Sequence, residues 1–191
     1  MSAQETGQLA SLLRSGLYAQ AAALELARSP QAITLAMEGF GEGQTGVGSV
    51  QCNDGTTRLF DLPSVLDLMR SDPGLRDEMD RAWCVSSLIL LGDRLAEEGY
   101  FDRAPVLEMV RHLRNGVAHG NRFGFHKPEE LESWPAHTRE AACWTPHPFE
   151  ITPDLEGTTV LFDFMGPGDI LDLLISVSTY LQDEYKSDEG Q

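Results

Sequence analysis

Apolar side chains recur at helical spacing in several long stretches of the sequence. Positions three and four residues apart share one face of a helix, so this pattern is typical of amphipathic helices that bury one side. Proline marks two of the expected starts, after Asp61 and after Asp72, and Asp102 is expected to cap a third helix. The expected helices cover about 7–28, 61–69, 73–98, 103–120 and 169–185. The pattern therefore predicts a mainly α protein, built as a helical bundle.

Two further segments have the pattern of β-hairpins. Val50–Cys52 and Thr56–Phe60 flank an Asn-Asp-Gly turn, which is a strong hairpin signal. Phe149–Ile151 and Thr159–Phe164 flank a second region of turn residues. We therefore expect one or two small β-hairpins inserted into the bundle.

Length and composition fit one globular domain over residues 1–191. The chain is long enough for one sizeable core, and 41% apolar with 23% charged residues excludes wholesale disorder. The longest nearly apolar run, Cys84–Leu91, ends at Gly92-Asp93 and is too short to cross a bilayer. The first residues lack the pattern of a secretory signal, and three widely spaced cysteines indicate reduced thiols. We therefore expect a cytoplasmic protein without a membrane partner.

Charge is distributed unevenly along the chain. The net charge of −16 argues against broad non-specific binding to nucleic acid or anionic lipid. The window 103–127 nevertheless carries +4, from five basic residues against Glu108 alone, which leaves −20 for the remainder. A basic island in an acidic chain is a first indication of a site, although a solvated helix face would produce the same pattern.

The expected helix over 103–120 has two distinct faces. Its apolar residues cluster on one side, which is expected to be the core face: Val106, Val110, Leu113 and Val117. Arg111, Asn115 and His119 follow each other at four-residue steps along another side. Arg114 lies at the boundary of that side. One helix thus displays two guanidiniums, an amide and an imidazole in a compact polar strip.

These groups suit the cleavage of a phosphodiester without a metal. An imidazole titrates near neutral pH and can accept or donate a proton. A guanidinium binds phosphate oxygens and stabilises the charge that builds in the transition state. RNA supplies its own nucleophile, the 2′-hydroxyl. The strip is therefore interpreted as a candidate ribonuclease site that acts on RNA.

The motif Arg114-Asn115-x-x-x-His119 resembles the R-x4-6-H motif of the HEPN superfamily, including the polar residue that often follows the arginine. Later residues are similar to one bacterial branch of that superfamily: Gly120-Asn121-Arg122-Phe123, Ala142-x-Trp144, Leu155-Glu156-Gly157 and Gly168-Asp169. The resemblance covers about residues 88–181 and leaves the first 60 residues unplaced. It implies an up-and-down helical bundle of the HEPN type.

The resemblance also implies a function. Active HEPN proteins are metal-independent endoribonucleases, often toxins or antiviral effectors, and their motif helices meet in a cleft between two copies. A homodimeric toxin or phage-defence ribonuclease is implied here, with 2′,3′-cyclic phosphate products. His119 would act as general acid or base and Arg114 would hold the scissile phosphate, while Asn115 would orient one of them or form a hydrogen bond across the dimer. Arg111 and Arg122 are expected to bind RNA, and an antitoxin or regulatory protein is a further expected partner.

Two other interpretations stay open. A non-catalytic HEPN-like module would dimerise and bind a protein or nucleotide partner, and the charge of −20 outside the island favours it because RNA is a polyanion. A purely structural interpretation treats Arg114 and His119 as residues that favour the helix dipole, with Gly120 ending the helix.

Two weaker patterns are set aside. Gly41–Gly46 matches the G-x-G-x-x-G pattern of nucleotide sites, but a hairpin and not a helix is expected after it. The segment 126–147 holds three histidines and Cys143, which could ligate zinc, but their spacing fits no standard zinc finger. We therefore expect neither a cofactor nor a metal.

Overall fold

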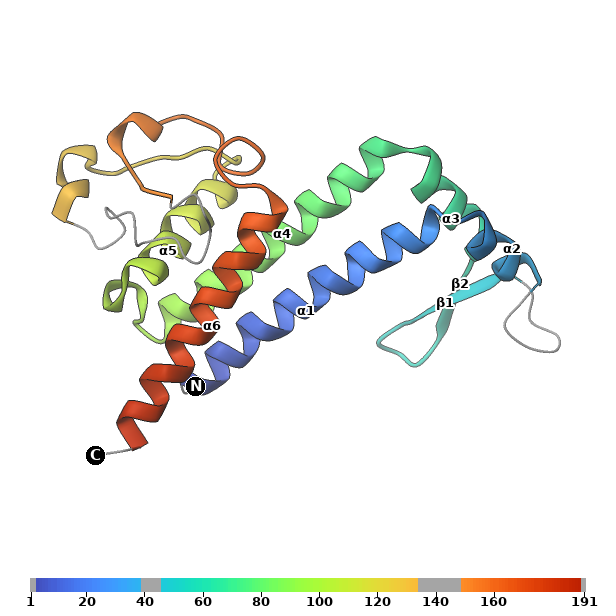
Figure 1. Ribbon diagram of the computed structural model, residues 1–191, viewed down its shortest axis with the longest axis horizontal. Helices are drawn as coiled ribbons and strands as arrows, with labels where there is room; N and C mark the ends of the chain where they lie inside the picture. Colours follow the sequence, from blue (N-terminus) through green and yellow to red (C-terminus); the bar gives the residue numbers. More distant parts are fainter. Residues whose placement is uncertain (1–2, 39–45, 134–148, 190–191) are drawn as a thin grey trace. The chain divides into compact units, whose positions relative to one another are not determined.

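Helices dominate the fold. The computed structural model describes residues 3–38, 46–133 and 149–189 (Figure 1). The α-helices in these residues are α1 (Ala3–Ala27), α2 (Pro30–Glu38), α3 (Leu62–Ser71), α4 (Pro73–Glu97), α5 (Pro105–Ala118) and α6 (Pro167–Glu189). The short 3-10 helices are η1 (Phe101–Arg103), η2 (Pro128–Ser133) and η4 (Pro153–Leu155). Strands β1 (Val47–Gln51) and β2 (Thr57–Asp61) pair as one antiparallel hairpin. The expected mainly α fold with a small hairpin is confirmed. Over the described ranges, no helix has both the length and the apolar character needed to cross a membrane.

Two helix starts show how proline sets the boundaries of the elements. α4 begins as expected, and the Asp72 carboxylate accepts the Leu75 N–H at 3.1 Å. α5 begins at Pro105 and not near Asp102, so the predicted Asp102 cap is wrong. The N-cap is Ala104, which is extended at φ −155° and ψ 152° because a residue before proline is disfavoured in the helical region.

Contacts divide the chain into two compact units, each with its own buried apolar cluster. The first unit comprises residues 1–17 and 80–191, and the second comprises residues 18–79. The expectation of a single domain over 1–191 stays a prediction. All residues of the candidate motif belong to the first unit.

The second unit has a small core. Among the residues that the structure describes in this unit, the buried apolar cluster comprises Leu24, Ala27 and Met69. α2 was not expected from the sequence; it starts at a proline and packs on α3. The hairpin is confirmed, with Gly48 opposite Phe60 and the phenyl ring occupying the space that a side chain at Gly48 would need. Both strands leave large apolar side chains exposed, at Val47, Val50, Leu59 and Phe60.

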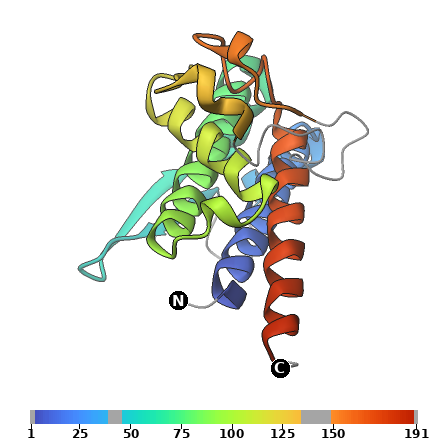
Figure 2. The same cartoon turned by 90° about the vertical axis from the view of Figure 1, so that its left-hand side faces the viewer.

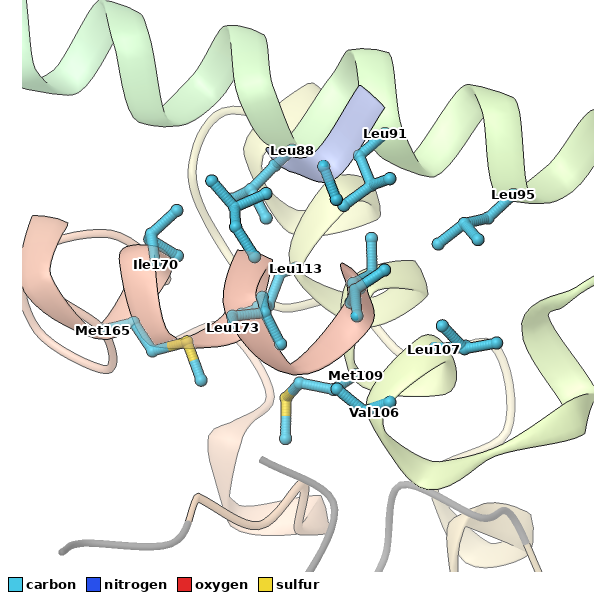
Figure 3. Close-up of a cluster of buried hydrophobic side chains, with 14 of the residues drawn as sticks. Leu88, Leu91, Leu95, Val106, Leu107, Met109, Leu113, Met165, Ile170 and Leu173 are labelled. Atoms are coloured by element: carbon cyan, nitrogen blue, oxygen red, sulfur yellow. The ribbon is translucent and has the colours of Figure 1, made fainter. Parts of the chain in front are cut away.

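The core of the first unit lies between α4, α5 and α6. Figure 3 shows leucines of α4 facing side chains of α5 and α6. Among the fully buried residues are Leu88, Leu91, Leu95, Leu107, Met109, Leu113, Ile170 and Leu173. The first half of α1 lies beside α6 in both views (Figures 1 and 2), and there the Ser11 and Ser178 hydroxyls are 2.8 Å apart. The apolar faces predicted for α4, α5 and α6 are confirmed at these positions.

The loop before α6 does not form the second hairpin, so that prediction is wrong. Thr159 forms only an isolated bridge with Arg122, the residue four positions beyond the end of α5. Phe162 then adopts φ 78°, a left-handed conformation that interrupts an extended strand. Residues 158–165 form a loop instead, which is called the 158–165 loop below.

Candidate functional site

α5 has one buried and one partly exposed side. The predicted core face is confirmed, because its four residues are at most 8% exposed: Val106, Val110, Leu113 and Val117. Arg114 and Asn115 are half-buried and leave the helix on another side. His119 follows Ala118, the last helical residue, and is exposed. The end of α5 therefore carries the three predicted catalytic residues at the surface of the first unit.

The Arg114 guanidinium is held by two neighbours. Its Nε and Nη2 donate to Oδ1 of Asp93 on α4, at 2.9 and 2.5 Å. Its Nη1 donates to Oδ1 of Asn115 at 3.2 Å. A guanidinium has five N–H bonds, so two of them have no partner among the residues that the structure describes. The Arg114 side chain as a whole is 33% exposed.

A glycine on α4 lets the stem of Arg114 lie against that helix. A Cβ atom at Gly92 would stand 2.6 Å from Cγ and 2.8 Å from Cβ of Arg114. Carbon atoms in contact are normally about 3.5–4.0 Å apart, so a side chain at Gly92 would displace the arginine. In the sequence, Gly92-Asp93 stands out only as the end of an apolar run. The available signal was this polar break inside a long helix.

His119 stands at the C-terminal end of α5. Its backbone has left the helical region, at φ −108° and ψ 43°, and its N–H donates to the Asn115 and Gly116 carbonyls at 3.1 and 3.2 Å. Within the described ranges, the imidazole makes no hydrogen bond or ion pair with Arg114 or Asn115. The structure therefore brings the arginine and the amide into contact and leaves the imidazole apart from them.

Arg111 binds a buried carboxylate on its own helix. Its Nη2 contacts Oε1 of Glu108, whose side chain is 1% exposed, and His112 Nε2 lies 3.6 Å from the same oxygen. Burial raises the pKa of the Glu108 carboxyl; Arg111 opposes this rise, and Asp102 adds to it. The Arg111 side chain is 29% exposed. Its expected contact with RNA stays a prediction.

Arg122 anchors the chain that follows α5. Its backbone N–H donates to the Gly116 carbonyl at 3.1 Å, and its Nη1 donates to the Gly157 carbonyl at 2.7 Å. The side chain is exposed. The expected role of Arg122 in RNA binding likewise stays a prediction, beside this structural role.

Asn121 fixes the 158–165 loop to the end of α5. Its Oδ1 accepts the Leu161 N–H at 2.8 Å, and its Nδ2 donates to the Leu161 carbonyl at 3.2 Å. Its backbone is left-handed at φ 61°, a conformation that asparagine tolerates better than most residues. The side-chain amide thus takes the place of a paired strand residue. The loop is anchored two residues after His119.

Other residues behind the HEPN resemblance make structural contacts where they are described. The Glu156 carboxylate accepts the Phe125 N–H at 2.7 Å. The Asp169 carboxylate accepts the N–H of the residue before α6 at 2.8 Å, as expected at a helix start. Ala142 and Trp144 lie outside the described residues.

Neither a group of metal ligands in the described residues nor a match to a known protein helps to assign this site. Over residues 3–38, 46–133 and 149–189, no three histidine, cysteine, aspartate or glutamate side chains are grouped to hold a metal ion. His137, Cys143, His147 and residues 41–45 lie outside those ranges. Comparisons with protein-family models, curated proteins and solved structures find no match to this chain.

Proposed function

We propose that this chain is a metal-independent endoribonuclease of the HEPN type. The observation that carries the proposal is the arrangement at Arg114, whose guanidinium is fixed by Asp93 and Asn115 while two N–H groups have no partner among the described residues and the side chain is 33% exposed. A planar guanidinium held in this way is suited to bind phosphate oxygens. Donors that are fixed before the reaction stabilise the developing charge without further reorganisation.

The remaining steps are assigned to the end of the same helix. The imidazole of His119 accepts the proton of the RNA 2′-hydroxyl or donates one to the leaving 5′-oxygen. Attack of the 2′-oxygen on phosphorus breaks the bond to the 5′-oxygen and leaves a 2′,3′-cyclic phosphate. Asn115 supports the reaction indirectly, because its Oδ1 accepts from the Arg114 guanidinium.

We assign the complete site to a homodimer in which two copies of α5 face one cleft. A twofold axis places the same surface of both copies against each other. No contact in the described part of one chain joins the Arg114 guanidinium to the His119 imidazole. In a dimer whose α5 helices face each other, the partner copy would offer a second imidazole to each arginine. This geometry supports a site built from both chains.

A non-catalytic interaction module is the second candidate, and the contact with Asp93 favours it. The carboxylate neutralises the charge of Arg114, and the whole chain carries −16. Both features oppose the approach of a polyanion such as RNA. In this alternative the α5 surface would dimerise and bind a protein or nucleotide partner, and Arg114 would have a structural role.

RNA cleavage in the presence of EDTA tests the proposal. The wild-type protein is expected to cleave unstructured RNA and to leave 2′,3′-cyclic phosphate ends. R114A and H119A are each expected to lose activity by roughly a hundredfold or more. R94A is a matched control, because Arg94 is 32% exposed and pairs with Glu97 at 3.2 Å. H126A is the control for an exposed imidazole.

Two results would overturn the ribonuclease proposal. One is a wild-type protein that leaves RNA intact in EDTA, and the other is cleavage by R114A and H119A at the wild-type rate. Light scattering gives the oligomeric state, and a monomer at assay concentration contradicts the shared cleft. A dimer that binds a protein or nucleotide but does not cleave RNA supports the interaction module.

A further inference from the structure

Phe162 combines an unfavourable backbone conformation with an exposed aromatic ring. It lies at φ 78° in the 158–165 loop, the orange segment before α6 in Figure 1. The turn is closed by hydrogen bonds from the Phe162 N–H to the Met165 carbonyl at 2.9 Å and from the Met165 N–H to the Val160 carbonyl at 3.0 Å. The residue is 39% exposed. A phenylalanine that is strained and not buried is not explained by packing of the core.

The turn itself does not require a phenyl ring. A left-handed residue is normally glycine or asparagine, because larger side chains are strained there. Asn121, whose side chain is hydrogen-bonded to Leu161 next to Phe162, is also left-handed and follows this preference. Strained residues that a fold retains are concentrated at functional sites. The side chain of Phe162 is therefore a candidate for a binding role.

The phenyl ring is stacked against a cation on one face. The guanidinium carbon of Arg81, on α4, lies 4.6 Å from the ring centroid. This contact orients the ring, as a cation over an aromatic face does in general. An aromatic ring backed by a guanidinium is a platform on which a nucleobase can stack.

The platform and Arg114 share one face of α4. Phe162 stacks on Arg81, and the stem of Arg114 lies against Gly92, eleven residues further along the same helix. Eleven residues of an α-helix correspond to about 16 Å along the axis and only about 20° around it. The two sites are therefore on the same side of α4. Asn121 also ties the loop of Phe162 to the chain two residues beyond His119.

We propose that Phe162 is a base-stacking residue for single-stranded RNA. An unpaired base stacks on the exposed part of its ring while a phosphate a few nucleotides away lies at Arg114. This inference rests on the proposed function, because it takes Arg114 as the phosphate site. It deepens that function by assigning a base contact to Phe162, a residue outside the Arg114 and His119 motif, and such stacking requires an unpaired base.

Binding of an RNA that cannot be cleaved tests the inference. The probe is a fluorescein-labelled single-stranded oligonucleotide of 2′-O-methyl RNA, which lacks the attacking hydroxyl, and the readout is fluorescence anisotropy. F162L keeps an apolar side chain at the same position but removes the aromatic face. It is expected to weaken binding by roughly five- to a hundredfold, the range for the loss of one stacked base. F162W and F162Y keep an aromatic face and are expected to bind like the wild type.

A stability measurement separates a binding role from a packing role. F162N puts a residue that tolerates the left-handed conformation at this position. It is expected to raise the melting temperature or leave it unchanged while it weakens binding of the oligonucleotide as F162L does. A ring that merely packs against Arg81 would give the reverse, a lower melting temperature with unchanged binding.

The outcomes distinguish this inference from the proposed function. If the wild-type protein binds the oligonucleotide through Phe162 but cleaves no RNA, the ribonuclease proposal is contradicted and the stacking site is supported. If the wild-type protein cleaves RNA and F162L binds and cleaves equally well, the stacking site is contradicted and the ribonuclease proposal is supported. No binding of the oligonucleotide by the wild type overturns the inference.

Discussion

Arg114 on α5 and Asp93 on α4 form an ion pair in which Nε and Nη2 of the guanidinium both donate to one carboxylate oxygen, at 2.9 and 2.5 Å. The pair joins residues 21 positions apart in the chain. Both side chains of the ion pair are partly exposed, 33% for Arg114 and 48% for Asp93, so the contribution of the pair to the free energy of unfolding is small. Its main effect is on the direction in which the guanidinium points.

Replacement of Asp93 tests this orienting role. Asp93→Ala is expected to lower kcat for RNA cleavage by roughly ten- to a hundredfold, because a displaced guanidinium no longer matches the phosphate. Asp93→Asn keeps an oxygen acceptor and is expected to retain more activity than Asp93→Ala. The protection of the Arg114 Nε–H from exchange with water, measured by NMR, reports the contact without an activity assay. Equal protection in the wild type and in Asp93→Ala contradicts the orienting role.

The amide of Asn121 is expected to stabilise the first unit. Asn121→Gly removes both hydrogen bonds to Leu161 but keeps the left-handed backbone accessible. Its free energy of unfolding is expected to fall by about 1–3 kcal/mol. Asn121→Ala adds the strain of a left-handed alanine and is expected to be less stable than Asn121→Gly by roughly 1 kcal/mol. Urea unfolding measures both, and an alanine variant more stable than the glycine variant contradicts this account.

Glu108 is expected to make stability fall as pH rises. Burial raises the pKa of Glu108 in the folded protein above its value in the unfolded chain, so the folded state holds this proton more tightly. The stability from this group is complete below the unfolded pKa, near 4.5, and is lost as pH rises through the folded pKa. A glutamine at this position cannot ionise, so as pH rises through the folded pKa of Glu108, the Glu108→Gln variant is expected to become more stable relative to the wild type. Urea unfolding at a series of pH values measures the difference, and a difference independent of pH contradicts the prediction.

Cys84 is expected to resist alkylation in the folded protein. Burial raises the pKa of the Cys84 thiol to about 12, and the charge of Asp80 adds to the rise. The reactive thiolate is therefore almost absent at neutral pH. Iodoacetamide followed by peptide mass spectrometry is expected to label the half-buried Cys52 under native conditions and Cys84 only in urea. Rapid native labelling of Cys84 contradicts its burial.

The sequence was most informative where local rules decide the structure. The period of Val106, Val110, Leu113 and Val117 predicted the buried face of α5, because apolar burial follows the helical repeat. The Asn-Asp-Gly turn predicted the hairpin of the second unit for a similarly local reason. At the start of α5 two local rules compete, and the restriction that Pro105 places on Ala104 overrides the capping tendency of Asp102.

Long-range contacts account for what the sequence did not predict. Residues 159–164 are rich in the β-branched and aromatic side chains typical of a strand. Two hydrogen bonds with the Asn121 side chain nevertheless hold Leu161, and a left-handed residue follows it. Asp93 was not a candidate, since its role depends on where α5 crosses α4. Nothing in the spacing along one helix identifies a partner on another.

The small cluster of the second unit has a consequence for dynamics. Among the described residues of 18–79, the buried apolar cluster comprises Leu24, Ala27 and Met69, so little apolar burial opposes a local opening there. Backbone amides there are expected to exchange with deuterium sooner than those of Leu88, Leu113 and Leu173, whose protection approaches that of global unfolding. Exchange in two separate kinetic groups would mean that the hairpin region can open and close while the end of α5 stays folded.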